Sequence, residues 1–549
     1  MLATRLRTMR EAGMLGGGTL QGGIRLARNV LLRDFHPSTL WGLHAANLPD
    51  KLALVEGERL LTWRELDARI NRLAQGLLSI GIRPGDRVAY MLRNSIEWIE
   101  SLAACSKIGA AAVFVSYRYT PPEIEYLVSN SEAALLVFGA DYREVVAQAK
   151  ERLGLPDRAF LEVGGAPGSP FPSYDELIHR SSEEEPPREL RSRGGSRVIL
   201  YTSGTTGRPK GAVRDLSRAG LGSLLDFLQA VPFRRSDRHL VAAPLYHATG
   251  SGFATIHVSL GATLYLLDPF HPLEFLKLVD REKITTSALV PTMLRAILML
   301  PEEERKRYDV SSLRVIVCTG SALPQNLKEA ARSYLGPVLY DLYGATEMGW
   351  VTVATPDDQI RKPGSVGRPV PGTDVVLLSE ERVPVADGEV GELFARNPVT
   401  IEGYHGNEEA TRKSRWEGYF SVGDLAVRDA DGYITLVDRK TDMVISGGMN
   451  IYPAEIETVL VAHPKIFEAA VIGVPDEHWG ESLVALIVPR PGQTITDEEV
   501  IAHCRQSLAG YKIPRRIERV PELPRNPTGK VLKKELRHRL EKGTDLFSQ

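Results

Sequence analysis

The chain has 549 residues, 43% of them hydrophobic and 25% charged, and its formal net charge is −2. This length predicts about three or four domain-sized units with enough apolar residues for a large buried core, which excludes a disordered chain and a small stapled scaffold. The near-neutral charge provides no overall attraction to nucleic acid, so a nucleic-acid-binding protein is not expected.

The N-terminal segment carries arginines around a glycine cluster and lacks the apolar region of a secretion signal. We expect a loosely ordered leader here, in preference to a basic arm that associates with a surface.

The longest apolar stretch, Leu102–Val115, contains Lys107 and falls short of the roughly 18 residues that cross a membrane, so it predicts a buried helix followed by a strand. Three isolated cysteines, Cys105, Cys318 and Cys504, suit a reducing compartment. Together these features predict a soluble cytoplasmic protein and leave peripheral membrane contact open.

Most of the chain is expected to alternate between helices and strands. Apolar residues recur at helical spacing over Leu61–Ile80, and a strand is expected over Arg87–Leu92. Gly164–Ser196 gathers Gly, Pro and Ser and predicts a loop or subdomain boundary, with its run Glu183–Glu185 in solvent. The alternation that follows predicts parallel strands with crossover helices, an α/β fold. Its expected strands are Val198–Tyr201, His239–Ala243, Ala262–Leu267, Ile284–Val290, Val315–Thr319 and Val338–Leu342, and its expected helices are Pro272–Lys283, Pro291–Leu300 and Leu323–Leu335.

Two further regions are expected towards the C-terminus. Short strands and glycine turns over Gly364–Ile434 predict a small β subdomain. From about residue 438 a separate α+β domain is expected, with helices at Pro453–Ala462 and Asp497–Leu508, strands near Ala469–Val474 and Leu483–Val488, and a basic helix from Lys530. We therefore expect a large domain of α/β layers with a β subdomain, residues 1–437, divided internally at about residues 195 and 370, and a smaller domain, residues 438–549.

The strongest local motif is Tyr201–Gly211, with the sequence YTSGTTGRPKG, directly after an expected strand. Glycines let the backbone approach a ligand and present N–H groups to phosphate oxygens, and the hydroxyl side chains and Lys210 add further donors. No Ser or Thr follows the lysine at the spacing of a Walker A loop. The motif predicts a phosphate-binding loop that contacts its ligand through Thr202, Ser203, Gly204, Thr205, Thr206, Gly207 and Lys210.

With this loop the sequence resembles the adenylate-forming family of acyl-CoA synthetases, firefly luciferases and peptide-synthetase adenylation domains. Further motifs of that family follow in the expected order at Pro244–Gly250, Tyr343–Glu347, Gly418–Asp424, Asp438–Glu457 and Pro524–Lys530. The resemblance implies an ATP- and Mg²⁺-dependent ligase, which converts a carboxylic acid to acyl-AMP and pyrophosphate and then transfers the acyl group to coenzyme A with release of AMP. A mixed anhydride with AMP supplies the good leaving group that a free carboxylate lacks.

The resemblance also implies roles for individual residues in the first half-reaction. Lys530 is expected to bridge the substrate carboxylate and the α-phosphate, because two anions must meet there. Glu347 is expected to hold Mg²⁺ together with Thr202, and Thr346 to contact the phosphate. His247 is expected beside the acyl group, although a buried core histidine is nearly as good an interpretation. Expected nucleotide contacts beyond the phosphate loop are Gly320, Ser321, Ala322, Asp341, Leu342, Tyr343 (stacked on adenine), Gly344, Ala345 and the ribose clamp of Asp424 and Arg439.

The second half-reaction implies a rotation of the C-terminal domain. In the resembled family this domain turns about a hinge and replaces the lysine loop with a surface that admits pantetheine. Ser446–Asn450 matches that surface, and Gly447 and Gly448 leave room for a thin ligand. The hinge departs from the family pattern, since Thr441 stands where Asp or Lys is usual.

The residues after His247 bear on the identity of the acid. Ala248–Gly252 contains no acidic side chain to pair with an amino group, so an α-amino acid is not expected. Ser251 stands where some long-chain members carry a tryptophan, and we expect an open tunnel with Trp350 in its wall. A medium- or long-chain fatty acid is therefore expected, with an aryl acid as the nearest alternative.

Three other functions stay open at this point. The chain could be an acyl-AMP ligase that loads a carrier protein, a luciferase-like oxidative enzyme, or a non-catalytic nucleotide-binding regulator. The joint presence of Lys530, Glu347, Asp424 and Arg439 argues against the regulator. The expected assembly is a monomer or a homodimer.

Overall fold

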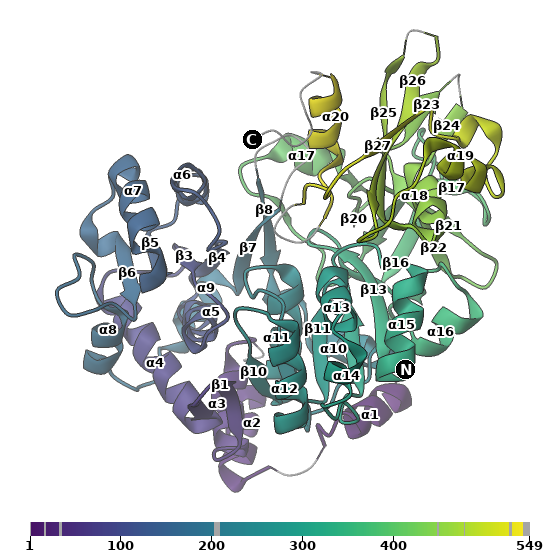
Figure 1. Cartoon of the computed structure of the whole chain (residues 1–549). Coiled ribbons are helices and arrows are strands. Elements are labelled where there is room, and N and C mark those ends of the chain that lie inside the picture. The colour runs from purple at the N-terminus through teal and green to yellow at the C-terminus, as the bar shows by residue number, and fades with distance from the viewer. Residues whose placement is uncertain are drawn as a thin grey trace.

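The structure is a computed structural model that describes residues 2–15, 18–31, 36–202, 209–446, 449–476, 478–525 and 530–541. The C-terminal domain, yellow in Figure 1, sits on one end of a larger body built from three β-sheets and their helices. The fold is mixed α/β, as expected from the alternation of strands and helices.

The first sheet has seven strands in the order β18-β8-β7-β4-β3-β5-β6. Its inner strands pair in parallel, whereas β8 pairs antiparallel with both β7 and β18. The strands are β3 (Arg87–Met91), β4 (Ala111–Phe114), β5 (Leu135–Gly139), β6 (Phe160–Val163), β7 (Arg197–Thr202), β8 (Lys210–Asp215) and β18 (Gly403–Tyr404).

The second sheet has nine strands in the order β15-β14-β13-β12-β11-β9-β10-β1-β2. The strands from β13 to β1 are parallel, and this confirms the predicted crossover topology. They are β1 (Leu52–Glu56), β2 (Arg59–Thr62), β9 (Arg238–Val241), β10 (Thr263–Leu266), β11 (Thr286–Leu289), β12 (Val315–Cys318), β13 (Leu339–Ala345), β14 (Gly349–Ala354) and β15 (Arg368–Pro369).

Two smaller sheets complete the chain. The six-stranded sheet contains β16 (Asp374–Leu378), β17 (Val390–Arg396), β19 (Arg415–Trp416), β20 (Tyr419–Phe420), β21 (Asp424–Arg428) and β22 (Ile434–Arg439), in the region where a β subdomain was expected. The C-terminal sheet contains β23 (Val444–Ser446), β24 (Met449–Ile451), β25 (Ile466–Asp476), β26 (Gly480–Pro489) and β27 (Arg516–Arg519).

The helices cover these sheets and separate the two large ones. Those of the large body are α1 (Leu2–Glu11), α2 (Leu20–Leu31), α3 (Thr39–Asn47), α4 (Trp63–Ser79), α5 (Ile96–Ile108), α6 (Pro121–Asn130), α7 (Arg143–Leu153), α8 (Tyr174–Arg180), α9 (Arg188–Gly194), α10 (Leu221–Ala230), α11 (Ala248–Leu260), α12 (Pro272–Glu282), α13 (Pro291–Leu298), α14 (Glu302–Arg305), α15 (Gln325–Leu335), α16 (Pro356–Arg361) and α17 (Glu408–Lys413). Those of the C-terminal domain are α18 (Pro453–Ala462), α19 (Asp497–Arg505) and α20 (Lys533–Glu541).

Local chemistry accounts for the long helix α4. Thr62 caps its first turn in a capping box with Glu65, which satisfies backbone N–H groups that would otherwise lack partners. Leu66, Ile70 and Leu77 then recur on one face and are buried. Burial of each such side chain stabilises the fold by about 1.5–3 kcal/mol. Helix α4 spans Trp63–Ser79 and confirms the helix predicted over Leu61–Ile80.

The expectation of a loosely ordered N-terminal leader is wrong, and that of a loop over Gly164–Ser196 is wrong for part of the range, while its alternative, a subdomain boundary, stays a prediction. The N-terminal leader contains helices α1 and α2, whose sequences carry few helix-breaking residues apart from glycine. Gly164–Ser196 contains α8 and α9, and its acidic run is not only solvated, since Glu183 pairs with Arg72 and Glu185 with Arg25. These ion pairs join residues that are far apart in the sequence, so no local sequence pattern predicts them.

The domain boundaries stay a prediction. The strand order shows that each large sheet contains strands from distant parts of the chain. Strands β1 and β2 precede the first sheet in sequence yet join the second. Strand β18 lies about 190 residues after β8 and closes the edge of the first sheet. The two large sheets are thus assembled from segments far apart in the chain.

Candidate active site

The ends of strands from both large sheets bring the expected phosphate and metal residues together. Thr202 ends β7, and Glu347 follows the end of β13. Thr202 Oγ1 donates a hydrogen bond to Glu347 Oε1 at 3.2 Å, and the Tyr404 hydroxyl on β18 donates to the same oxygen at 3.1 Å. Ligands of open α/β sheets bind beyond the carboxyl ends of strands, so this carboxylate lies in the usual place for a ligand site.

Two cations lie beside this carboxylate. Arg214 on β8 donates from Nη2 to the carbonyl oxygen of Thr346 at 2.5 Å. Burial lowers the pKa of Arg214 to about 10, although Glu347 acts in the opposite direction. Lys210 Nζ lies 5.2 Å from the centre of the Tyr404 ring. An anionic ligand next to Glu347 would therefore meet positive charge from β8.

The expected ribose clamp is formed by facing residues of the six-stranded sheet. Asp424 on β21 and Arg439 on β22 are register partners, and Arg439 Nε lies 3.1 Å from Asp424 Oδ1. The other carboxylate oxygen, Oδ2, accepts a hydrogen bond from the Tyr343 hydroxyl at 2.7 Å. Burial and the neighbouring Asp424 raise the pKa of Tyr343. The predicted adenine and ribose residues thus form one connected group.

Lys530 of the C-terminal domain interacts electrostatically with both residues of this clamp. Burial, and secondly the charge of Arg439, lower the pKa of Lys530 to about 8, while Asp424 partly offsets the shift. The two domains are also joined at a distance from the clamp, where Arg295 Nη1 on α13 lies 3.4 Å from Glu468 Oε1 on β25. Arg525 Nη2 pairs with the other oxygen of Glu468 at 2.8 Å. The ion pair of Arg295 with Glu468 holds the C-terminal domain against α13 of the large body.

The expected acid pocket lies at the start of α11. His247 is the N-cap residue of that helix, and its Nε2 is buried with no hydrogen-bond partner among the described residues. Burial, with a smaller effect of Arg118, lowers the pKa of His247 to about 4, so its ring is neutral at physiological pH. Gly320 has a φ of +95°, and a Cβ there would lie 3.3 Å from Val290 and 3.8 Å from Thr249. The glycine leaves space beside the residues that follow His247.

The other residues expected to contact the nucleotide differ in their surroundings, since some lie in the core and one forms an ion pair. Leu342 is buried in the core, and a Cβ at Gly344 would lie 2.2 Å from the Gly349 carbonyl, so only glycine fits there. Asp341 pairs with Lys328 of α15 at 2.6 Å, and burial raises its pKa. Its carboxylate is not brought to Glu347 or Asp424. The expected contacts Ser203, Gly204, Thr205, Thr206, Gly207, Gly447 and Gly448 lie outside the described residues.

Trp350, expected in the wall of an acyl tunnel, packs in an aromatic cluster of the hydrophobic core. The Trp350 ring on β14 packs on Phe227 with 4.7 Å between ring centres, and Phe253 of α11 packs on Phe227 at 6.3 Å. The Ser251 hydroxyl donates to the His247 carbonyl oxygen at 2.8 Å. The tunnel itself stays a prediction.

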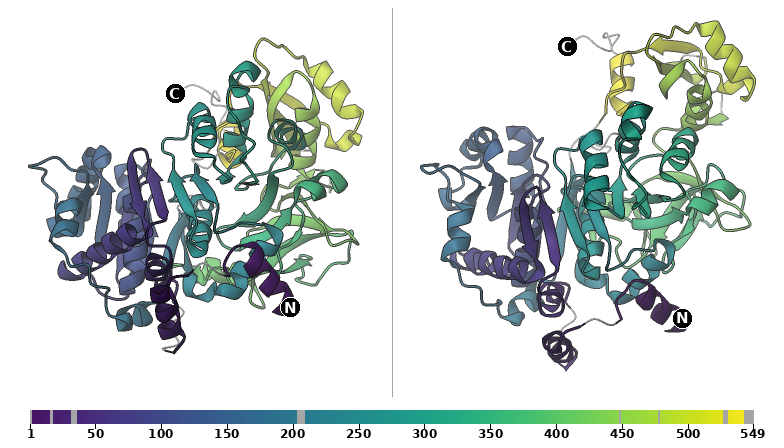
Figure 2. Two further views of the ribbon diagram at one scale, coloured as in Figure 1. Left: turned by 90° about the horizontal axis from the view of Figure 1, so that it is seen from below. Right: turned by 60° about the horizontal axis from the view of Figure 1, so that its bottom comes forward.

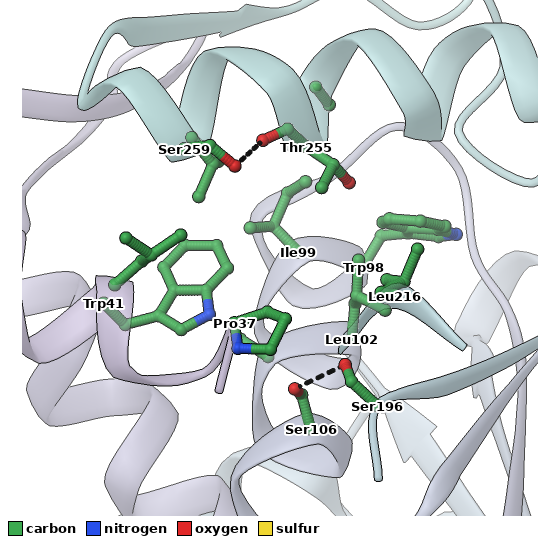
Figure 3. Close-up of a pocket in the computed structure, with 14 residues that line it drawn as sticks. Pro37, Trp41, Trp98, Ile99, Leu102, Ser106, Ser196, Leu216, Thr255 and Ser259 are labelled. Carbon is green, nitrogen blue, oxygen red and sulfur yellow. Dashed lines mark hydrogen bonds between the residues drawn. The ribbon is translucent and has the colours of Figure 1, made fainter. Parts of the chain in front are cut away.

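A separate apolar cavity of about 50 Å³ borders α11 between α3 and α5 (Figure 3). Trp41, Trp98 and Leu102 line it, and its polar groups are hydroxyls such as Thr255 and Ser259, which already donate to backbone carbonyls of α11. Without a titratable side chain in its lining, it supplies no group for acid activation.

The sequence match extends over most of the chain. Residues 43–405 match the family model of the AMP-binding enzyme, and residues 455–530 match that of the AMP-binding enzyme C-terminal domain. The chain belongs to the AMP-binding enzyme family. It is 38% identical over 505 residues to a feruloyl-CoA synthase from Amycolatopsis sp., which covers 91% of this chain and 98% of that protein.

Two other similar proteins span the range of acids. The ligase is 32% identical over 480 residues to the long-chain-fatty-acid–CoA ligase FadD13 of Mycobacterium tuberculosis (strain ATCC 25618 / H37Rv), with 87% of this chain and 92% of that protein covered. It also resembles the solved structure of the anthranilate CoA ligase AuaEII in complex with anthranoyl-AMP, at 29% identity and a TM-score of 0.85, with 93% and 98% of the two chains covered.

The family assignment identifies the chain as an AMP-forming acid–CoA ligase that uses ATP, Mg²⁺ and coenzyme A. The residues present fit the metal. Mg²⁺ is usually held by one or two carboxylates together with substrate phosphates, and Glu347 supplies one carboxylate. Among the described residues no group of three or more His, Cys, Asp or Glu side chains could hold a metal ion by itself.

Proposed function

We propose that the ligase activates an aryl or arylpropenoic acid to its adenylate and transfers the acyl group to coenzyme A. The observation that carries this choice is the 38% identity over 505 residues to a feruloyl-CoA synthase, a match that covers 91% of this chain and 98% of that protein. The similarity to the solved structure of the anthranilate CoA ligase AuaEII, at 29% identity and a TM-score of 0.85, supports the same choice.

A medium- or long-chain fatty acid, preferred from the sequence, is the second candidate. Ser251 provides no bulky gate one turn into α11, and its side chain is buried against the His247 carbonyl. The similarity to the FadD13 ligase, although at the lower identity of 32%, points the same way. The two candidates differ in the shape of the acyl group, which is a flat ring system in one and a long flexible chain in the other.

The acid class is tested by coenzyme A-dependent AMP release across a panel of acids. We expect cinnamates and benzoates to be used with at least about 10-fold higher kcat/KM than octanoate or palmitate, the discrimination that a shape-selective apolar pocket supplies. A preference for palmitate of that size would contradict the aryl proposal and favour the second candidate. Rapid transfer to a carrier protein with none to coenzyme A would overturn the proposed acceptor.

In the adenylation step we assign the chain's own residues as follows. Lys530 holds the substrate carboxylate and the α-phosphate together, and its charge stabilises the transition state. Asp424 and Arg439 orient the ribose, and His247, neutral through burial, borders the acid without adding charge. Mg²⁺, when bound beside Glu347, neutralises phosphate charge. The contacts among Thr202, Tyr404 and Glu347 support this assignment, because they fix the carboxylate in one orientation.

For thioester formation we propose that the C-terminal domain turns about Lys440 and Thr441. The Lys440 backbone N–H donates to the Gly423 carbonyl oxygen at 2.8 Å, so the chain leaves the large domain there. The rotation would separate Arg295 from Glu468 and remove Lys530 from the clamp. Ser446–Asn450 would then face the adenylate and admit the pantetheine arm.

Adenylation by this ligase is expected to weaken at alkaline pH. Lys530 acts as a cation, and its pKa is lowered to about 8, so the charged form is present below that pH and is lost as pH rises through it. ATP–pyrophosphate exchange should therefore decline above about pH 8. Lys530→Arg keeps its charge at all these pH values, because arginine titrates above about pH 12. If ATP–pyrophosphate exchange by the Lys530→Arg variant declined around the same pH, a group other than Lys530 would be responsible and the prediction would be contradicted.

A further inference from the structure

Helix α2 packs on the protein through its polar side. Gly22 is buried, and a Cβ there would lie 1.6 Å from Asn47 Oδ1. Arg25 Nη2 donates to Glu185 Oε2 at 2.5 Å and lies so close to Gly42 that a Cβ at that glycine would be 1.9 Å away. A close glycine contact and an ion pair therefore determine which side of the helix faces the protein.

The apolar side of α2 faces away from the protein. Leu20, Ile24 and Leu31 are four and seven residues apart and follow one face of the helix. Their exposed fractions are 83%, 61% and 83%, and Leu26 is 51% exposed. A surface helix normally turns its apolar stripe to the core, so the orientation of α2 is the reverse of the usual one. A row of large apolar side chains in water indicates a binding surface.

The charge around this row is positive. Residues 2–31 contain five arginines and a single acidic residue, Glu11. Three of the arginines pair with carboxylates of the chain, whereas Arg10 and Arg28 form no ion pair with a described residue. Arg28 lies on the same helix as the apolar row, beside its exposed edge. Arginines next to an apolar helix face are typical of helices that lie on anionic lipid.

We propose that α2 is a docking helix for an anionic lipid surface, which inserts Leu20, Ile24 and Leu31 among the acyl chains with Arg28 at the headgroups. A second copy of the chain is a poorer occupant, because it would bring together two arginine-rich segments with almost no acidic residues. Within the described residues no helix is long and apolar enough to cross a bilayer, so the contact lies at the surface.

The position of α2 is compatible with catalysis on such a surface. Both α1 and α2 lie at the end of the molecule opposite the C-terminal domain, as the views of Figures 1 and 2 agree. They also precede residue 43, where the match to the family model begins. A ligase docked through α2 therefore keeps its C-terminal domain clear of the lipid and free to turn.

Sedimentation of the full chain with lipid vesicles tests the proposal. We expect binding to vesicles of equal phosphatidylglycerol and phosphatidylcholine and little binding to phosphatidylcholine alone. Ile24→Gln with Leu31→Gln should lower the partition coefficient at least about 10-fold, since two large apolar side chains no longer enter the lipid. Arg28→Gln should lower it about 5-fold. The matched control, Leu60→Gln with Ile360→Gln, replaces one leucine and one isoleucine that are 53% and 57% exposed elsewhere on the surface, and it should bind as the unchanged chain does.

Each other outcome overturns the proposal. No binding of the unchanged chain to anionic vesicles removes the lipid surface as occupant. Equal binding by the Ile24→Gln/Leu31→Gln variant places the contact elsewhere. A dimer in size-exclusion chromatography that this variant converts to a monomer, without vesicle binding, identifies a second copy as the occupant. AMP release with a water-dissolved acid should be unchanged in the variant, so this test is independent of the acid proposed above.

Discussion

Replacing Lys530 with alanine is expected to lower adenylation about 10²- to 10³-fold while thioester formation from supplied acyl-AMP stays within a few-fold of normal. The magnitude is that of removing one preorganised stabilising group from a transition state. The selectivity follows because Lys530 interacts electrostatically with Asp424 and Arg439 in this domain orientation and, in the proposed rotation, would leave the clamp. ATP–pyrophosphate exchange measures the first step, and release of AMP from synthetic acyl-AMP with coenzyme A measures the second.

A matched control lies on the same domain. Lys465 pairs with Glu499 at 2.6 Å near the surface, and Lys465→Ala should leave both steps unchanged. Equal loss of both steps in Lys530→Ala would contradict the assigned role, because a residue that acts only in adenylation cannot slow a reaction that begins after it. Unchanged circular dichroism would exclude unfolding as the cause.

Glu347→Gln is expected to lower adenylation about 10²-fold and to raise the Mg²⁺ concentration needed for half-maximal exchange. Glutamine keeps an oxygen that accepts from Thr202 and Tyr404 but removes the negative charge that a hard cation requires. The lost charge also leaves Arg214, which is shielded from water, with less compensation. A Mg²⁺ titration of ATP–pyrophosphate exchange measures both effects.

The control for this change is Glu402→Gln, on the connection between β17 and β18. Glu402 pairs with Arg218 at 2.7 Å and with Arg197, outside the group around Glu347. Its replacement removes the same charge from a partly exposed ion pair, which is worth at most about 1 kcal/mol. An unaltered Mg²⁺ dependence in Glu347→Gln would remove this residue from the metal site.

Local patterns predicted the repeating part of the fold well. Strand β12 and helix α18 are short apolar or amphipathic segments bounded by clear turn or cap residues, and both were expected within about a residue or two of their bounds. The neighbourhood of Thr202 and Glu347 was also expected, because both residues stand in motifs of the resembled family. Thr202 ends a strand of the first sheet and Glu347 follows a strand of the second, so the strand pattern alone did not predict their contact.

Long-range contacts account for what the sequence did not reveal. Tyr404 and Arg214 contact Glu347 and Thr346, yet neither stands in a recognisable local motif. The aromatic cluster joins Phe227 and Trp350, which are more than 120 residues apart, so their contact leaves no local pattern in the sequence. Helix α2 was missed because glycine pairs argue against helix, whereas here Gly22 is required for close packing on Asn47.

Because β18 pairs with β8, the first sheet can be completed only after residue 404 has been synthesised. The first six strands of that sheet have emerged by Asp215, but the partner of β8 follows only with Tyr404. At about 5–20 residues per second, the ribosome needs roughly 10–40 s to supply it. During this interval the open strand edge is a template for pairing with other nascent chains. We therefore expect fragments that end before residue 403 to aggregate, and the phosphate and metal residues to acquire their final contacts late in translation.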